Sequence, residues 1–216
     1  MKRIIFWLVF VVVLALIIWG LIIAINKPST NGLPDLGAPA PVTAADHVEG
    51  PANAPVTLIE YGDFQCPACA EYSGEIEQLA VDASTTLRIV FRHFPLAQHQ
   101  NSMIAAQAAD SASDQGKFWQ MYKLIYDGQT NWENQSYADA RKTYDGYAMQ
   151  LGLNMAKFDQ DVDSPAAKQF ILGEQSEGQQ LGIDYTPTFF INGKVINNPN
   201  SYDEFKADIT KAAQQG

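Results

Sequence analysis

The chain has 216 residues and a formal net charge of −10, with 24 acidic and 14 basic side chains. This charge argues against nucleic-acid binding, because a phosphate backbone needs Lys and Arg side chains to displace its counterions. It also argues against docking of the folded part on an anionic lipid surface. The length suffices for one good-sized domain together with an anchor.

An uncharged run of 22 residues extends from Ile4 to Ile25, directly after Lys2 and Arg3. As a helix it would span roughly 33 Å, enough for a bilayer core of about 30 Å. A cleaved signal peptide is the alternative, but its apolar region is usually only about 7–15 residues long. We therefore expect a cytoplasmic tip at residues 1–3 and a single-pass transmembrane anchor at residues 4–25, with the remaining chain outside the cell membrane.

The segment that follows, residues 26–45, is predicted to be a flexible linker. It contains four prolines and two glycines, and its apolar residues have no periodicity. Such a segment is expected to be partly extended and to pack no core of its own. The folded domain is then expected at residues 46–216.

Two strands with a helix between them are predicted at the start of this domain. Residues 56–61 and 87–92 are rich in β-branched and aromatic side chains, and the stretch between them is helical to about Ala83. A β-α-β unit of this kind normally has parallel strands. The order of the predicted elements is then completed by a helical block and a final β-β-α unit.

The helical block is expected at about residues 98–182. Two aromatic stripes at helical spacing, Phe118–Ile125 and Tyr137–Leu151, are interpreted as core and not as a cofactor pocket. Ser164-Pro165 is typical of a helix start, and Gly182 of a helix end.

The C-terminal unit carries a strong hairpin signal. Asn192-Gly193 joins two short apolar runs, which is typical of a tight β-hairpin. Ser201, followed by Glu204 three residues later, predicts the capping box of a last helix.

The only two cysteines, Cys66 and Cys69, follow a predicted strand and begin a helix. Free N–H groups and the helix dipole stabilise a thiolate at this position, and Pro67 suits the first turn. The spacing permits a strained, easily exchanged disulfide, whereas a bridge closing so short a loop would contribute little as a structural staple. The pair therefore predicts thiol–disulfide exchange, with Cys66 as the exposed nucleophile and Cys69 as the resolving thiol.

Two segments in this order resemble the thioredoxin superfamily. They are Phe64–Cys69, which reads Phe-Gln-Cys-Pro-Ala-Cys, and Tyr185–Gly193, which reads Tyr-Thr-Pro-Thr-Phe-Phe-Ile-Asn-Gly. The Cys-Pro-x-Cys form and the helical block resemble its DsbA-like branch, and residues 46–55 resemble the start of anchored DsbA-like proteins. The resemblance implies an α/β, thioredoxin-like fold with a large helical insertion and a protein thiol–disulfide oxidoreductase activity.

The resemblance also implies roles for residues around the pair. Pro187 matches a cis-proline beside the cysteines, and Thr186 matches the residue whose backbone pairs with bound peptide. Pro67 and Ala68 are expected to contact the substrate. Glu60 matches a buried acid that relays the proton of Cys69, although the residue pattern alone would favour a surface carboxylate.

Two positions depart from the family pattern. Ala68 stands where the strongest oxidants of the branch have histidine, and it can neither hydrogen-bond nor charge-stabilise a thiolate. We therefore expect a less depressed Cys66 pKa and a milder oxidant than in the Pro-His form. Tyr185 stands where many relatives have glycine, which predicts a differently shaped groove beside Thr186.

Three alternatives stay open at this point. A zinc site is disfavoured, because Cys-x2-Cys lacks a second close pair and His47, His93 and His99 are scattered along the sequence. A non-enzymatic, anchored peptide-binding or chaperone module could use the same fold. The third is the direction of exchange, since the pair could serve a reductase or isomerase as well as an oxidase.

An external location and the resemblance favour oxidation. The expected substrates are cysteine-containing proteins, and the resemblance implies reoxidation by a quinone-linked membrane partner. No metal and no bound cofactor are expected beyond a redox-active Cys66–Cys69 disulfide.

Overall fold

The structure, a computed structural model, describes residues 36–215. The predicted cytoplasmic tip (1–3), the transmembrane anchor (4–25) and the first part of the linker (26–35) lie outside the described residues and stay predictions. Within residues 36–215, no helix combines the length and the apolarity that crossing a membrane would require.

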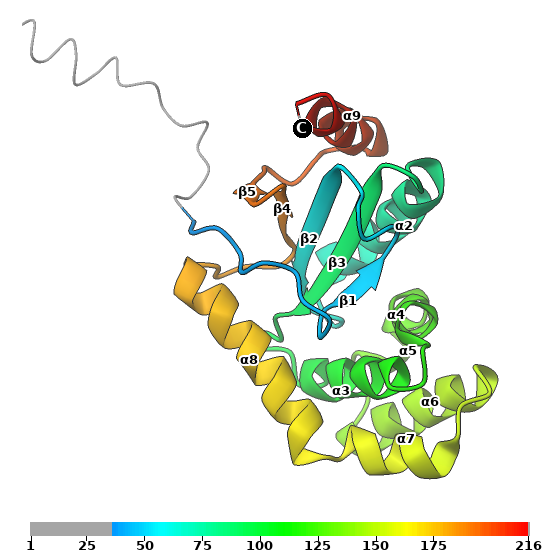
Figure 1. Cartoon of the computed structure of the whole chain (residues 1–216). Coiled ribbons are helices and arrows are strands. Elements are labelled where there is room, and N and C mark those ends of the chain that lie inside the picture. Colours follow the sequence, from blue (N-terminus) through cyan, green and yellow to red (C-terminus); the bar gives the residue numbers. More distant parts are fainter. Residues whose placement is uncertain (1–35, 216) are drawn as a thin grey trace, which may run out of the picture. The chain divides into compact units, whose positions relative to one another are not determined.

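A five-stranded sheet in the order β1-β3-β2-β4-β5 forms the centre of the domain (Figure 1). Its strands are β1 (His47–Glu49), β2 (Val56–Gly62), β3 (Leu87–His93), β4 (Thr188–Ile191) and β5 (Lys194–Val195). Strands β2 and β3 are parallel, as the sequence predicts, and every other neighbouring pair is antiparallel. The predicted β-α-β unit is confirmed, with helix α2 (Pro67–Asp82) as its crossover.

The two faces of the sheet are covered by different elements. Helices α2 and α9 (Tyr202–Ala213) pack on the face that includes Leu58, Ile89 and Phe189. The opposite face includes Ile59, Val90 and Phe190, and it is covered by Leu181, Ile183 and Val42. Side chains on both faces of β2 and β3 are therefore buried, as is usual for parallel strands.

A block of six helices separates β3 from β4 and gathers at one end of the sheet (Figure 1). These are α3 (Ser102–Ser113), α4 (Phe118–Asp127), α5 (Gln129–Trp132), α6 (Tyr137–Gln150), α7 (Met155–Val162) and α8 (Pro165–Leu181). The predicted helical insertion is thus confirmed. Trp132, Tyr144 and Phe158 are fully buried in it, whereas Tyr137 is exposed, although the predicted stripe placed it in the core.

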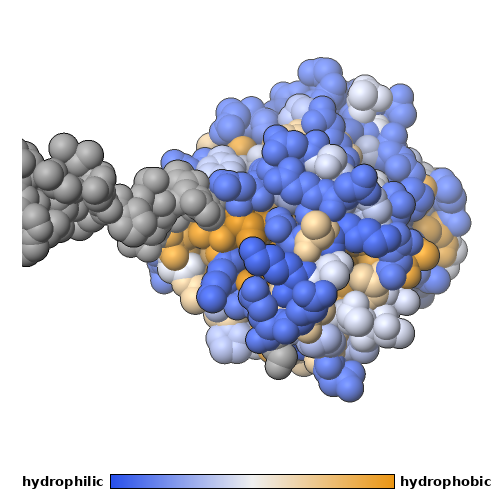
Figure 2. Space-filling model, turned by 90° about the horizontal axis from the view of Figure 1, so that it is seen from above, coloured by the Kyte–Doolittle hydropathy of each residue, from blue (hydrophilic) through white to orange (hydrophobic). Residues whose placement is uncertain are grey.

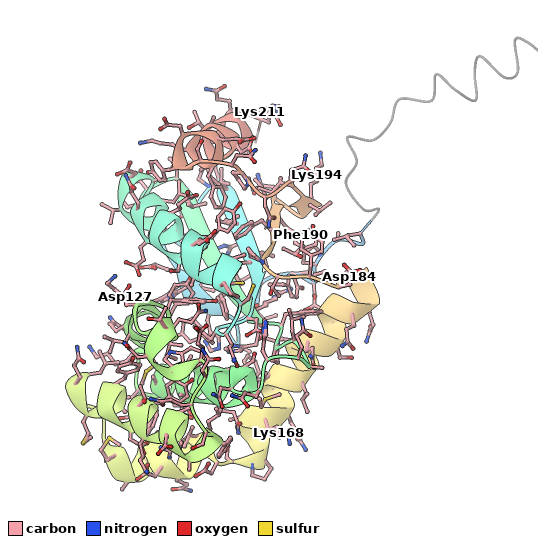
Figure 3. The ribbon with its side chains drawn as sticks, turned by 180° about the vertical axis from the view of Figure 1, so that it is seen from behind. Asp127, Lys168, Asp184, Phe190, Lys194 and Lys211 are labelled. Atoms are coloured by element: carbon pink, nitrogen blue, oxygen red, sulfur yellow. The ribbon has the colours of Figure 1, made fainter. Side chains whose placement is uncertain are left out.

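Most of the predicted helix and turn signals are confirmed. The Ser164 side chain accepts a hydrogen bond from the Ala167 N–H at the start of α8, and Gly182 ends that helix with φ at 92°. Asn192 and Gly193 join β4 to β5 with φ values of 48° and 78°. Asp184 lies in the loop that returns the chain from α8 to Phe190 of β4 (Figure 3).

The last helix begins at the predicted residue but with a different partner for its acidic side chain. Ser201 Oγ accepts from the Glu204 N–H at 3.3 Å, as a capping box requires. The Glu204 carboxylate instead accepts from the Asn200 N–H at 2.9 Å. One half of the predicted capping box is therefore present.

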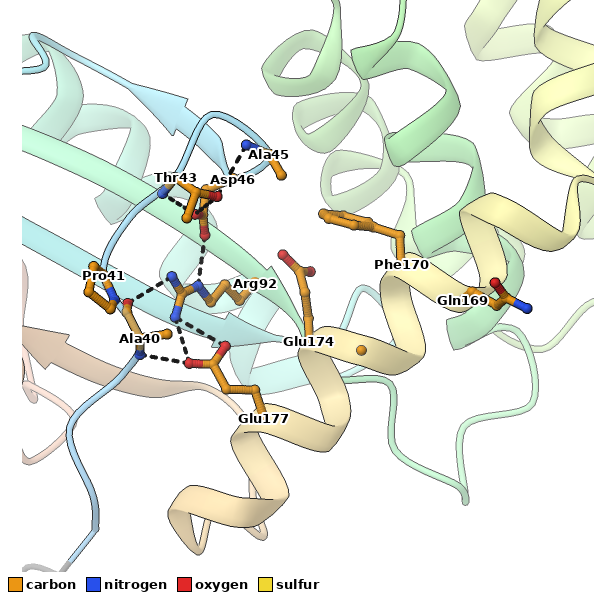
Figure 4. A pocket seen from close by; sticks show the side chains of 11 residues that line it. Ala40, Pro41, Thr43, Ala45, Asp46, Arg92, Gln169, Phe170, Glu174 and Glu177 are labelled. Carbon is orange, nitrogen blue, oxygen red and sulfur yellow. Dashed lines mark hydrogen bonds and ion pairs between the residues drawn. The ribbon is translucent and has the colours of Figure 1, made fainter.

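The prediction of a free linker up to residue 45 is wrong for residues 36–45. The Ala40 N–H donates to Glu177 at 2.7 Å, and Arg92 donates to the Ala40 carbonyl at 3.0 Å. Arg92 is only 3% exposed and also bonds Asp46 and Glu177 (Figure 4). An extended segment needs no apolar periodicity to dock when a buried arginine and its carboxylate partner supply its hydrogen bonds. The segment leads into strand β1, which the sequence did not predict.

On the face that Figure 2 shows, hydrophilic side chains predominate and hydrophobic ones occupy limited areas between them. Few large apolar side chains are exposed among the described residues, and the most exposed are Val81, Met149 and Tyr137.

Candidate active site

The N-terminus of α2 holds Cys66 at the end of β2. Cys66 is the N-cap residue, with φ −74° and ψ 122°, and Pro67 occupies the first turn. The Cys66 N–H donates to the Asp63 carbonyl at 3.0 Å, and the Ala70 N–H donates to the Cys66 carbonyl at 3.2 Å. The cysteine therefore faces the free N–H groups of the helix, where negative charge is stabilised.

The two cysteines have contrasting surroundings, and the structure describes both as free thiols. Cys66 keeps 7% of its surface exposed, less than an exposed nucleophile was expected to have, and Cys69 keeps none. The hydrogen bond from Cys69, helped by the Thr186 side chain and by the N–H groups of Cys69 and Ala68, lowers the pKa of Cys66 to about 5 against the opposing effect of burial.

The pKa of Cys69 is shifted in the opposite direction from that of Cys66. Burial, the hydrogen bond to Cys66 and the negative charge of Glu60 raise the pKa of Cys69 well above its ordinary value. At neutral pH the pair therefore has one thiolate and one thiol, with the thiolate on the sulfur nearer to solvent.

Glu60 lies beneath this pair in the middle of β2. It is 1% exposed, so the alternative of a surface carboxylate is excluded. Tyr122 of α4 donates to Glu60 Oε2 at 3.4 Å, while Oε1 has no hydrogen-bond partner among the described residues. Burial raises the pKa of Glu60 to about 8, with a further contribution from the Cys66 charge.

Gly62 leaves the space that this carboxyl group occupies. A Cβ at Gly62 would lie 2.4 Å from the Phe91 ring and 2.9 Å from Glu60 Oε1. A side chain there would therefore displace the buried acid.

The loop before β4 contacts the cysteines from the other side. The Thr186–Pro187 peptide bond is cis. Cys66 Sγ lies 3.4 Å from the Thr186 carbonyl oxygen, to which the thiol form can donate, and Asn198 Nδ2 donates to the Pro187 carbonyl at 2.9 Å. Thr186 is 8% exposed, whereas Tyr185 is 38% exposed beside it.

The sequence analysis missed Asp63 and its partners, which fix the loop before Cys66. The Asp63 carboxylate is fully buried and pairs with His99 Nδ1 at 2.7 Å. It also accepts from the N–H groups of Gln65 and Leu96, both at 2.8 Å, and from the Ser102 hydroxyl. The only signal for Asp63 was its place at the end of a strand, directly before the cysteine motif.

The hydrogen bond to Asp63 and the charge of that carboxylate raise the pKa of His99, with a smaller contribution from Cys66. His99 therefore brings a positive charge toward the thiolate when it is protonated.

Gln129 was also missed, and it connects the helical block to the same loop. Its Nε2 donates to the carbonyls of Phe64 and Cys66 at 2.8 and 3.0 Å. Gln65 makes a reciprocal connection, since its Nε2 donates to the Glu133 carbonyl at 2.8 Å. The helical insertion thus holds the backbone that carries Cys66.

A second cluster of chemically active side chains does not include the cysteines. His47 and His93, scattered in the sequence, are brought together with Asp110, and their potential ligand atoms all lie within 4.8 Å of one another. Burial lowers the pKa of His93 well below its usual value. These are the described residues that could hold a metal ion.

Comparisons with known proteins connect the chain to a family and to longer relatives. A family model described as Thioredoxin matches residues 43–211. The chain is 36% identical over 157 residues to the Na⁺/H⁺ antiporter NhaA 1 of Mycobacterium sp. (strain KMS), which covers 71% of this chain and 24% of that protein. It is 34% identical over 197 residues to the Na⁺/H⁺ antiporter NhaA of Herminiimonas arsenicoxydans, covering 91% and 28%. The chain thus spans about a quarter of the length of these curated relatives.

Solved structures share the fold. Oxidised BdbD from Bacillus subtilis has a TM-score of 0.71 at 24% identity, covering 84% of this chain and all of that one. Alpha-DsbA1 from Wolbachia pipientis has a TM-score of 0.68 at 22% identity, covering 81% and 94%. ScsC from Proteus mirabilis, in a transitional conformation, has a TM-score of 0.67 at 16% identity, covering 81% and 75%. With a family model that matches most of its length and a fold of the DsbA-like form, this chain belongs to the thioredoxin family.

Proposed function

We propose that the protein is a thiol–disulfide oxidoreductase that oxidises cysteine pairs in other proteins. The observation that carries this proposal is the asymmetry of the cysteine pair. Cys66 has its pKa lowered to about 5 at a helix N-terminus, while the pKa of the fully buried Cys69 is raised. This is the arrangement that disulfide exchange needs, because one sulfur must serve as nucleophile or leaving group while the other stays protected.

The oxidative reaction begins with a Cys66–Cys69 disulfide. A substrate thiolate attacks Cys66 Sγ, the bond between the two cysteines breaks, and Cys69 leaves with the electron pair. A second substrate thiolate then attacks the substrate sulfur of the mixed disulfide and releases Cys66 as a thiolate. The substrate gains a disulfide, and the enzyme gains two electrons.

Glu60 is the proposed proton relay for Cys69. With a pKa of about 8, its carboxyl group is mostly protonated at neutral pH, and its unpartnered Oε1 lies in the buried space beneath the helix. A protonated acid there can donate to the Cys69 thiolate as it leaves, and the carboxylate can accept that proton in the reverse direction.

The stabilised thiolate favours oxidation as the direction. A lowered Cys66 pKa stabilises the reduced form and so raises the reduction potential of the pair. We expect a potential above that of thioredoxin, about −270 mV, and below that of the strongest oxidant of the branch, about −120 mV, because Ala68 adds no further stabilisation. Reductase or isomerase activity on the same site is the runner-up.

Substrate binding is assigned to the surface around Cys66. Pro67 is exposed and Ala68 is half-buried, so both can contact a bound polypeptide. Across from them, the cis-Pro187 loop presents Thr186, whose backbone can pair with an extended segment. We assign cysteine-containing proteins as substrates, an extracytoplasmic location behind the anchor at residues 4–25, and a quinone-linked membrane partner for reoxidation.

Two single variants of the full chain test the activity. Cys66→Ser should abolish oxidation of a reduced, unfolded substrate protein. Cys69→Ser cannot form the Cys66–Cys69 disulfide and should not oxidise this substrate either. Its Cys66 thiolate should instead attack a substrate disulfide, release one substrate thiolate and accumulate a mixed disulfide visible on non-reducing gels. Undiminished biological activity in Cys66→Ser would favour a peptide-binding or chaperone role. A measured potential near about −270 mV would favour reduction over oxidation.

A further inference from the structure

The second cluster joins three elements that are far apart in the sequence. His47 lies in β1, His93 ends the neighbouring strand β3, and Asp110 lies in α3 of the helical block. His47 Nε2 and Asp110 Oδ1 are 3.4 Å apart, and a ring nitrogen of His93 completes a group whose atoms lie within 4.8 Å of one another. Two imidazoles and one carboxylate therefore converge on one point between the sheet and the helices.

Three of the four imidazole nitrogens in this cluster are buried without a hydrogen-bond partner among the described residues. His93 is 1% exposed, yet neither of its ring nitrogens has a hydrogen-bond partner among the described residues. His47 is 6% exposed, and its Nε2 is also without a hydrogen bond. Buried polar atoms are nearly always partnered, so unpartnered nitrogens on two neighbouring rings indicate a group that binds between the rings.

The surrounding side chains hold the two rings in place. The His47 ring stacks on Phe118 with ring centroids 3.8 Å apart and the planes inclined by 6°. The His93 ring packs edge-on against His47 and Phe170. The backbone N–H of His93 donates to the buried Glu174 carboxylate at 2.7 Å, which fixes the backbone of His93.

The spacing suits a small divalent ion. In a tetrahedral zinc site with bonds of about 2.0 Å, neighbouring ligand atoms are about 3.3 Å apart. The observed 3.4 Å between His47 Nε2 and Asp110 Oδ1 already matches that spacing. The third ligand atom, on the His93 ring, lies within 4.8 Å of the other two.

An opening to solvent provides a route for the ion and a place for a fourth ligand. A cavity of about 620 Å³ is lined by His47 and Asp110 together with Asp114, Asp161 and Phe170. Its carboxylates would attract a cation to the opening. Two imidazole ligands select zinc and similar transition metals over calcium and magnesium, which prefer oxygen ligands alone.

We propose that His47, His93 and Asp110 form a zinc site that ties strands β1 and β3 to helix α3, with water as the fourth ligand. The site is separate from the cysteine pair and goes beyond the proposed redox function. Its role is structural, because it connects the sheet to the helical insertion whose other helices hold the Cys66 loop.

The test measures zinc binding to the untagged full chain in detergent micelles. Cys66→Ser and Cys69→Ser are introduced together as the background, because a reduced cysteine pair would itself bind zinc. Equilibrium dialysis with metal analysis should find one zinc per chain. Asp110→Asn should weaken binding roughly 100-fold or more, since loss of an outer-sphere partner alone typically costs 10–100-fold.

The matched control is Asp114→Asn, at the C-cap of α3, four residues after Asp110 and lining the same cavity. This variant should bind zinc as the background does. Asp110 is the chosen ligand position because its side chain is 19% exposed, so its amide variant is expected to fold, whereas replacing the buried His93 could prevent folding.

Thermal unfolding gives a second readout. Free zinc at 100 times the dissociation constant of the background should raise the Tm of the background by roughly 5–10 °C and that of Asp110→Asn by no more than about 2 °C. Equal zinc affinity in Asp110→Asn and the background, or no stoichiometric binding at all, would overturn the site and leave water as the occupant of the cluster.

Discussion

Two histidine–carboxylate pairs lie near the carboxyl ends of β2 and β3, and their surroundings differ sharply. Near the cysteines, the Asp63 carboxylate accepts four hydrogen bonds, including one of 2.7 Å from His99. In the second cluster, His47 and Asp110 are 3.4 Å apart, and the neighbouring His93 ring has no hydrogen bond among the described residues. The protein supplies hydrogen-bond partners to the Asp63–His99 pair, whereas the second cluster has ring nitrogens without a partner among the described residues.

This difference separates two uses of buried polar groups. A fully hydrogen-bonded carboxylate acts as a structural brace, because each donor it accepts from fixes another piece of backbone. Asp63 in this way fixes the turn that leads into Cys66. Unpartnered ring nitrogens fix nothing by themselves, and their burial is compensated only when a ligand binds them.

The largest expected effect comes from exchanging each carboxylate for an amide. Asp63→Asn should lower the free energy of unfolding by about 3–5 kcal/mol, because it removes a buried charge that pairs with His99 and places N–H donors opposite other donors. Asp110→Asn in metal-free buffer should change it by less than about 1 kcal/mol. Urea unfolding of both variants measures the difference. Equal losses would show that the two pairs do not differ in the way described.

The pH dependence of stability sharpens the description of the cysteine site. In the reduced protein, the Cys66 pKa falls from 9.0 to about 5 on folding, so its contribution is full above pH 9 and is lost as pH falls through 5. The Glu60 pKa rises from 4.5 to about 8, so its contribution is full below pH 4.5 and is lost as pH rises through 8. Between about pH 5 and 8 the two dependences oppose each other.

Each single variant removes one of the two titrating groups, so its free energy of unfolding should follow the pH dependence of the remaining group. Relative to the reduced wild type, Cys66→Ser should lose stability as pH rises from about 5 to 8, and Glu60→Gln should gain it, each by up to about 1.4 kcal/mol per pH unit. Unfolding by urea at a series of pH values measures both. The second cluster is intact in every protein, so its own titration cancels in the differences. Parallel curves for the three proteins would contradict the assigned pKa shifts.

The sequence predicted the elements whose signals are local. The Asn192-Gly193 turn, the Ser164 cap and the Gly182 helix end depend on backbone preferences of single residues, and all three occur where predicted. The parallel β-α-β unit was equally predictable, since few topologies suit a strand, a helix and a second strand. Strand β1 and the docked segment at 36–45 were not, because their contacts with β3, Arg92 and Glu177 come from distant parts of the chain.

The same distinction applies to the side chains of the two clusters. Cys66 and Cys69 are recognisable from spacing alone, and the roles of Glu60, Thr186 and Pro187 came from family resemblance. Nothing local identified the bond of His99 to Asp63 or the approach of His47 to Asp110, which are separated by 36 and 63 positions. Only the helical insertion, folded back on the sheet, brings these partners together.

Glu60 and Glu174 provide a comparison of buried acids in the two clusters. Glu60→Gln should slow the departure of Cys69 from the Cys66–Cys69 disulfide, the step that forms the mixed disulfide, roughly 10–100-fold, because an amide cannot transfer the proton. Glu174, whose carboxylate accepts the His93 N–H, lies outside the cysteine site, so Glu174→Gln should leave this rate unchanged. Stopped-flow kinetics with a cysteine-containing peptide measure the step. Equal rates for wild type and Glu60→Gln would show that Glu60 does not transfer the proton in this step.

The smallest effect expected is that of the His99 charge on Cys66. The hydrogen bond to Asp63 raises the pKa of His99, so part of its population is cationic near neutral pH and stabilises the thiolate. His99→Gln should raise the pKa of Cys66 slightly and change the exchange rate by less than about 3-fold, since a tenfold change in the thiolate population would need a pKa change of one. His47→Gln, in the second cluster, should leave the Cys66 pKa unchanged. Titration of the thiolate absorbance measures both variants, and the same shift in each would mean that the Asp63–His99 pair acts only as a brace and contributes no charge to the cysteine site.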